Sequence, residues 1–451
     1  MKAKFAACTL FLFLMLPVSA FPQILNSDSG TPQNTGSIWY NWEEKAADGF
    51  QDPLIHWHYY WKNGLFIESR KKNIFVKIGT KVGFDTGYIG PDGELDRAFP
   101  GLGGFDHRFR RLRVYTLMTF WNDLEFKFEI DFANLTDIKD IWVRYTGNSF
   151  LSHFLLGHVK EPFSLEEITS SCVTTFMERS LSTNGFAPGR DIGLIYSDVR
   201  EDKRLTWAAG AFLVTGSFND VGSGKDALTD PMGTALTGRV TGLLWYEGNG
   251  KKLFHLGLSY SHQFRNENRD NDQMQIKVRP ETYLTDDRLV DTGKFHISNA
   301  DFVNPEIALV MGPFSLQGEY FHQLTSSGEA DDPDFWGFYF YGSYFITGEH
   351  RPYNTTKGIF STVKPNQNFR FMQSGWGAWE AAFQVSFIDL NSGAIQGGKE
   401  MDFTAGLNWY LNPNMRFLFN YVRAEVSDRQ NAPEISDGSA DILQARFQVH
   451  F

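Results

Sequence analysis

Residues 124–132, which read LEFKFEIDF, decide the fold. Apolar and charged residues alternate through the whole stretch: Leu124, Phe126, Phe128, Ile130 and Phe132 against Glu125, Lys127, Glu129 and Asp131. Because successive side chains of a β-strand point to opposite faces, a period of two predicts a strand with one apolar and one charged face.

The same two-faced pattern recurs along the chain to its last residue. It returns at residues 74–88, 254–261, 379–387, 401–411 and 443–451, and we count about sixteen such strands from Ile74 onward. Repeated strands that are apolar on one face and polar on the other are typical of an all-β transmembrane antiparallel barrel. We expect the barrel to be closed, since an open sheet edge in lipid leaves backbone polar groups unpaired.

The connections also predict a barrel. Tight turns are expected at residues 121–123, 247–251, 312–313 and 412–414. Longer polar or Gly-rich loops are expected at residues 90–107, 161–189, 217–233, 266–300, 391–399 and 427–440. Short periplasmic turns that alternate with long extracellular loops are the usual topology of bacterial barrels. Residues 349–372 depart from it, because they are long where a short turn is due.

The N-terminus resembles an export signal. Lys2 and Lys4 precede an apolar run at residues 5–16, and Val18-Ser19-Ala20 is a small-residue cleavage site. We therefore expect a signal peptide over residues 1–20, a periplasmic lead-in over 21–72 and the barrel over 73–451. The expected location is the bacterial outer membrane, and the terminal Phe451 looks like the assembly signal of such barrels.

Composition narrows the classes of function. Without Lys2 and Lys4, 40 of the 42 basic residues remain against 53 acidic ones, a net charge of −13 that argues against a nucleic-acid partner. Cys8 leaves with the signal, so Cys172 is alone and a disulfide within the mature chain is excluded. His56 and His58 have no Cys or carboxylate at ligand spacing, and we expect neither a metal nor another cofactor.

Several long motifs resemble a known family. They are GHVKEPFSLEEITSS at 157–171, FMERS at 176–180, PGRDIG at 188–193 and LNWYLNPNMRFLFNYV at 407–422, with FRR at 109–111, HLGLSY at 255–260 and VRPE at 278–281. These are similar to the phosphate-selective porins O and P, in order, from about Trp61 to Phe451. The resemblance implies a sixteen-stranded barrel, a homotrimer, and a channel that inward-folded loops narrow and basic residues line.

Basic residues are the candidate pore lining. Cationic side chains at the narrowest part of a pore favour anions, and Arg can donate several hydrogen bonds to one phosphate. Arg108, Arg110, Arg111 and Arg113 cluster where a long loop meets a strand. Strand parity predicts that Arg111 and Arg113 face the lumen, and that Arg110 lies near the rim or on a bulge.

The resemblance assigns a wider set of anion-binding residues. The implied set is Lys81, Arg110, Arg111, Arg113, Arg265, Lys277 and Arg279. Its phosphate-site arginine pair falls on Arg110 and Arg111, while Cys172 stands where phosphate-selective members carry a lysine after Thr-Ser-Ser. We therefore expect an anion-preferring pore, with phosphate and polyphosphate among its candidate solutes.

These features, together with the resemblance, predict a passive porin, not an enzyme, that contacts outer-membrane lipid as a homotrimer. It would pass small hydrophilic solutes, preferentially anions such as phosphate. Two alternatives stay open. One is a phospholipase-like barrel hydrolase, for which His255, Ser259 and Ser261 share a strand face, although the sequence contains neither G-x-S-x-G nor HExxH. The other is a surface-binding barrel with a plugged lumen.

Overall fold

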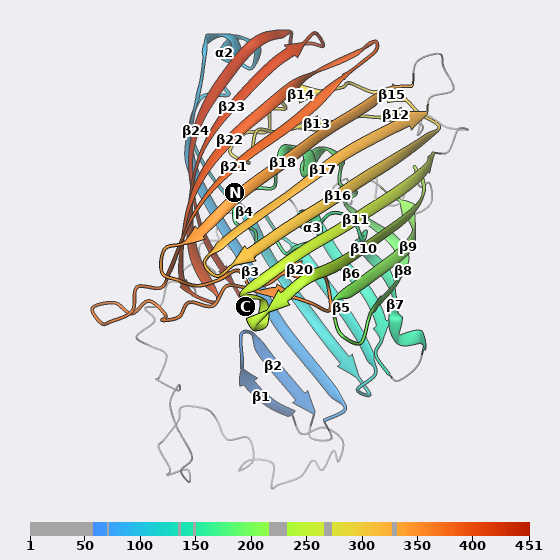
Figure 1. Cartoon of the computed structure of the whole chain (residues 1–451), viewed down its shortest axis with the longest axis vertical. Coiled ribbons are helices and arrows are strands. Elements are labelled where there is room, and N and C mark those ends of the chain that lie inside the picture. The colour runs from blue at the N-terminus through green and yellow to red at the C-terminus, as the bar shows by residue number, and fades with distance from the viewer. Residues whose placement is uncertain are drawn as a thin grey trace, which may run out of the picture. The chain divides into compact units, whose positions relative to one another are not determined.

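The computed structural model describes residues 57–69, 72–133, 137–147, 150–215, 232–265, 273–326 and 332–451. Within these ranges, sixteen strands form one antiparallel sheet in chain order, and the last of them pairs with the first (Figure 1). The prediction of a closed, sixteen-stranded antiparallel barrel is confirmed.

The barrel strands alternate in direction around the wall. They are β3 (Ile74–Pro91), β4 (Gly104–Phe120), β5 (Leu124–Asp131), β6 (Asp137–Tyr145), β7 (Phe154–Lys160), β8 (Arg190–Val199), β9 (Leu205–Val214), β10 (Gly233–Glu247), β11 (Lys252–Arg265), β16 (Asn299–Met311), β17 (Phe314–Ser326), β18 (Asp334–Phe345), β21 (Ala378–Ser392), β22 (Ile395–Asn412), β23 (Met415–Arg429) and β24 (Ile435–His450). A hairpin of β1 (Trp57–Trp61) and β2 (Leu65–Ser69) extends the sheet from the start of β3. The signal peptide lies outside the described residues, and the domain boundaries stay predictions.

The side chains of each strand separate into an outer and an inner set. On β11, Leu256, Leu258 and Tyr260 are exposed on the outer face, whereas His255 and Ser259 are buried inside. This is the arrangement that the alternating sequence predicts for a wall with lipid on one side. In the described ranges, no helix is long and apolar enough to cross a bilayer.

The predicted turns each join consecutive strands, but two of the predicted loops are much shorter than expected. The loop predicted at 391–399 is wrong, because β21 runs to Ser392, β22 starts at Ile395, and the two residues pair across a two-residue turn. Gly393 makes that turn with a φ of 54°, a conformation that favours glycine. The loop predicted at 427–440 reduces to residues 430–434 between β23 and β24.

Three connections fold into the barrel and fill part of it. The 161–189 loop carries α3 (Leu165–Ile168) and α4 (Leu181–Phe186), and the 273–298 loop carries β12 (Gln273–Met274), β13 (Lys277–Val278), β14 (Val290–Asp291) and β15 (Phe295–His296). The 346–377 segment carries β19 (Tyr353–Asn354) and β20 (Ile359–Phe360), which pack on the inner wall beside Leu243 and Leu253. The long segment that sequence analysis found in place of a short turn is therefore an inward fold.

The main apolar core lies inside the barrel, between these loops and the wall. Phe163 and Phe186 of the 161–189 loop join Phe302 and Phe321 of the wall in one buried cluster, and Leu284 of the 273–298 loop belongs to it as well. Shorter elements complete the connections: α2 (Gly93–Ala98), η3 (Phe150–His153) and η4 (Gly248–Gly250). Apolar packing thus holds the inward loops against the wall and fixes the positions of the polar side chains that they carry.

Candidate functional site

Arg110 and Arg111 lie at an irregularity in β4. Gly83 of β3 pairs with Arg111 and the next residue, Phe84, pairs with Phe109, so Arg110 is an extra residue in the ladder. Such a β-bulge re-aims side chains, and here both arginines reach groups inside the barrel. The bulge is one of the two positions that parity predicted for Arg110.

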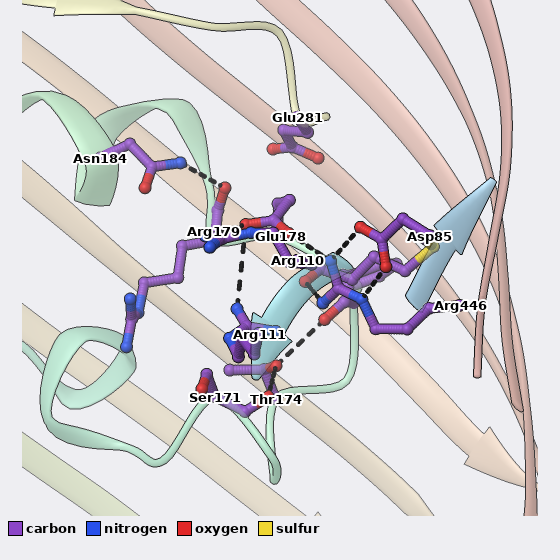
Figure 2. Close-up of polar contacts among 12 residues, drawn as sticks. Asp85, Arg110, Arg111, Ser171, Thr174, Glu178, Arg179, Asn184, Glu281 and Arg446 are labelled. Carbon is purple, nitrogen blue, oxygen red and sulfur yellow. Dashed lines mark hydrogen bonds and ion pairs between the residues drawn. The ribbon is translucent and has the colours of Figure 1, made fainter. Parts of the chain in front are cut away.

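Glu178, on the 161–189 loop, lies among three guanidinium groups (Figure 2). Arg110 donates to it through both arms of its fork, from Nε to Oε1 at 2.9 Å and from Nη2 to Oε2 at 3.0 Å. Arg446 also donates to Oε1, and Arg111 Nη2 lies 4.0 Å from Oε2. Burial by itself would raise the pKa of Glu178, but the attraction of the three arginines outweighs burial and lowers this pKa below its ordinary value.

Arg446 joins the first and last strands where the barrel closes. From β24 it donates to both carboxylate oxygens of Asp85 on β3, each at 2.6 Å, and its remaining nitrogen donates to the Met177 carbonyl oxygen. Both side chains of this ion pair are 1% exposed. We call Arg110, Arg111, Arg446, Asp85 and Glu178 the arginine cluster. Sequence analysis missed Arg446 as a site residue, although alternation on the last strand and barrel closure both pointed to it.

Arg111 is the least satisfied member of the arginine cluster. Its Nε and Nη1 atoms are buried and have no hydrogen-bond partner in the described part of the chain. The cluster holds three guanidinium groups against two carboxylates, which leaves one positive charge unmatched. An unmatched, buried cation with free donors is suited to bind an anion.

Tyr283, on the 273–298 loop, connects a fourth arginine to the cluster. Its ring centroid lies 3.4 Å from the Arg110 guanidinium carbon and 4.4 Å from that of Arg279. Arg279 is also held by Asp286 at 2.6 Å, and the Arg110 charge lowers the pKa of Tyr283. Sequence analysis had no signal for Tyr283, because the contact depends on how the loop folds inward.

The other predicted site residues have polar partners outside the arginine cluster or are exposed. Lys81 is bound to Glu129 at 2.9 Å, and Arg113 is bound to Asp131 at 2.6 Å, so both belong to a separate ion-pair network on β3, β4 and β5. Arg265 donates to Gln263 at 3.2 Å near the end of β11, and Lys277 is exposed on β13. The structure therefore brings together Arg110, Arg111 and Arg279 out of the seven residues that the resemblance implied.

The residues considered for a hydrolase do not form a nucleophile and base pair. The buried His255 contacts Glu306 at 2.9 Å and the Tyr353 hydroxyl at 2.6 Å. Ser259 Oγ accepts from the backbone N–H of Ser164 at 3.1 Å, which positions the 161–189 loop. Across the ranges that the structure describes, no group of three or more His, Cys, Asp or Glu residues is suited to a metal ion.

Comparisons with known proteins agree with this architecture. The family model described as phosphate-selective porin O and P matches residues 83–451. Porin O of Pseudomonas aeruginosa is 23% identical over 429 residues, which cover 86% of this chain and 91% of the relative. An uncharacterised protein of Caulobacter vibrioides is 25% identical over 406 residues, covering 87% of this chain and 76% of the relative.

Solved structures share the fold. The crystal structure of the outer membrane channel DcaP of Acinetobacter baumannii is similar over 85% of this chain and 99% of its own, with a TM-score of 0.50 and 12% identity. Family and fold together make this chain a channel of the outer membrane. Because the family match spans most of its length, the chain belongs to the phosphate-selective porins O and P.

Proposed function

We propose that the chain is a passive porin that prefers small anions and binds them at the arginine cluster, with phosphate as one ligand. The observation that carries this proposal is the unmatched positive charge of the cluster, together with the free Nε and Nη1 donors of Arg111. A cation between low-dielectric walls focuses the field and raises the local concentration of anions. The description of the family as phosphate-selective supports the same class of solute.

Arg111 is the residue that we expect to contact the anion. Arg110 and Arg446 already bind carboxylates through both arms of their forks. Among the described residues, the Arg111 side chain forms one ion pair, at 4.0 Å with Glu178, so its Nε and Nη1 donors are available. With Cys172 in place of the lysine that the family resemblance would supply, we propose a preference for anions as a class, in which phosphate binds but is not the sole solute.

Planar bilayer recording tests this function. In a potassium chloride gradient, the reversal potential of the wild type should indicate anion preference, and Arg111→Ala should shift it toward cations. Arg97→Ala is the matched control, because Arg97 is 77% exposed on α2 and should leave the selectivity unchanged. Added phosphate should block the chloride current of the wild type more than that of Arg111→Ala. A cation-preferring current that Arg111→Ala does not change would refute the proposal.

Further parts of the proposal concern assembly and export. We propose a homotrimer that contacts outer-membrane lipid through the apolar outer faces of its strands, and a signal peptide that is cleaved after Ala20. Native mass spectrometry of the detergent-solubilised protein should give the mass of three chains, and N-terminal sequencing should start at Phe21. The two alternatives make different predictions: a hydrolase would be active in a lipase assay, and a plugged barrel would not conduct.

A further inference from the structure

We propose that Glu178 is a tethered competitor of the permeating anion, a carboxylate of the chain itself that occupies the arginine cluster and sets its selectivity. This inference rests on the proposed function and adds a specificity-determining residue to it. A site that binds free anions would be expected to contain cations without an acid among them, yet Glu178 lies among the arginines. The Glu178 side chain is 4% exposed.

The contacts of Glu178 are those that a free oxyanion would make. Arg110 binds both of its oxygens through a bidentate fork, Arg446 binds one of them, and Arg111 faces the other. Arginine binds free carboxylates and phosphates in the same bidentate way. An incoming anion must therefore either share Arg111 with Glu178 or displace the Glu178 carboxylate from the cluster.

The loop that carries Glu178 is anchored by other contacts. Leu181 N–H donates to Ser386 Oγ at 2.8 Å, and Ser180 Oγ caps α4 by accepting from Thr183 N–H at 3.2 Å. Arg179 Nη2 donates to the Glu167 carbonyl oxygen at 2.9 Å. These bonds flank Glu178 and do not involve its side chain, so we expect the loop to keep its path when Glu178 is changed.

The expected effect follows from charge. Glu178→Gln leaves three guanidinium groups against the single carboxylate of Asp85, so the unmatched charge rises from one unit to two. A unit charge that acts over ~6 Å of water changes the local population of an ion by about threefold. The same charge raises the chloride population and lowers the potassium population, so the ratio of chloride to potassium permeability should rise by up to about tenfold.

The experiment compares three variants with the wild type in planar bilayers. Glu178→Gln should raise anion preference, whereas Glu178→Asp keeps the carboxylate and should stay close to the wild type. Glu380→Gln is the matched control, since it neutralises a buried carboxylate on the inner wall that accepts from Asn408 and Tyr410. Anion preference that rises in Glu178→Gln alone supports the proposal. An unchanged or lowered preference in Glu178→Gln, or an equal rise in Glu380→Gln, overturns it.

A measurement of rescue separates competition from a structural role. Glu178→Ala vacates the space of the carboxylate, so inorganic phosphate at constant ionic strength should raise its unfolding temperature in detergent more than that of the wild type. Equal shifts in both proteins would contradict the proposal.

The controls also separate this inference from the proposed function. A wild type without anion preference, unaffected by Arg111→Ala, refutes the function. An anion-preferring wild type that Glu178→Gln leaves unchanged refutes only the role of Glu178.

Discussion

Two glutamates are carried into the barrel by inward loops and meet opposite surroundings. Glu178, on the 161–189 loop, lies among Arg110, Arg111 and Arg446. Glu281, on the 273–298 loop, is 2% exposed and lies against the acidic residue Asp402 of β22. The neighbours therefore shift the pKa of the two glutamates in opposite directions, down for Glu178 and up for Glu281.

The surroundings of Glu281 disfavour its ionised form. Its carboxyl oxygens accept from Gln384 Nε2 at 2.7 Å and Thr404 Oγ1 at 2.5 Å, while its backbone N–H donates to Asp402 at 2.9 Å. Burial first, and then the charges of Asp402 and Glu166, raise the pKa of Glu281 well above its ordinary value. Glu178 can thus oppose a permeating anion electrostatically, whereas the hydrogen bonds of Glu281 dock its loop on the wall.

The largest effect is expected from Arg446→Ala, which removes the cation that two carboxylates share. Asp85 and Glu178 would keep their charges in a buried place, and breaking such a pair destabilises by about 3–5 kcal/mol. Equilibrium unfolding in urea, from phospholipid vesicles, should report this loss.

Two further variants serve as comparisons for the loss of stability in Arg446→Ala. Arg97→Ala breaks an exposed ion pair with Glu94 and should change the free energy of unfolding by about 1 kcal/mol or less. Arg446→Lys keeps the charge but loses the bidentate fork, so its loss of unfolding free energy should lie between those of Arg97→Ala and Arg446→Ala. If Arg446→Ala were as stable as Arg97→Ala, the electrostatic description of the cluster would be wrong.

Sequence alternation is enough to predict the wall but not the contents of the barrel. The alternation at residues 124–132 reports which way each side chain of β5 points, because that direction is a local property of a strand. Parity likewise assigned Arg111 and Arg113 to the lumen. Their partners depend on register between strands and on the paths of the loops, which are long-range properties.

Glu178 and Lys81 illustrate the limit of motif comparison. Glu178 belongs to the FMERS motif, yet nothing in its neighbourhood along the chain indicates that Arg110 and Arg446, at 68 and 268 residues' separation, converge on it. Lys81 was assigned to the anion site by its position in a motif, but its side chain forms an ion pair with Glu129 of β5 at 2.9 Å.

The second prediction concerns how the contribution of Glu281 to the stability of the protein depends on pH. A raised pKa means that the folded state binds the proton more tightly, so the contribution to stability is full at low pH. It is lost as the pH rises above the ordinary glutamate value of 4.5 toward the raised one. The titratable groups that face Glu281 are Asp402 and Glu400 on β22 and Glu166 on α3, all of which oppose its ionisation.

Glu281→Gln cannot ionise and should lose less stability than the wild type as the pH is raised from about 5 to about 9. The unfolding temperature from heat-dependent gel migration measures this difference at each pH. Glu247→Gln, at an exposed glutamate where β10 meets the tight turn to β11, should follow the wild type throughout. If the unfolding temperatures of Glu281→Gln and the wild type changed with pH in parallel, the raised pKa of Glu281, and with it the difference between the two glutamates, would be wrong.

The smallest effect is expected at Tyr283. This residue connects the surroundings of the two glutamates, because it lies two residues after Glu281 and its ring contacts Arg110 in the arginine cluster. Tyr283→Ala removes a cation–π contact and should destabilise by about 1 kcal/mol, whereas Tyr283→Phe keeps the ring and should not. Without the ring, Arg110 is less constrained, so phosphate should block chloride current a few-fold less strongly. Ionisation of Glu281 should loosen the 273–298 loop and move Tyr283 away from Arg110. The wild type at alkaline pH should then show the same weaker phosphate block, whereas Glu281→Gln should not. A block that depends on Tyr283 but not on pH would show that the two glutamates act independently.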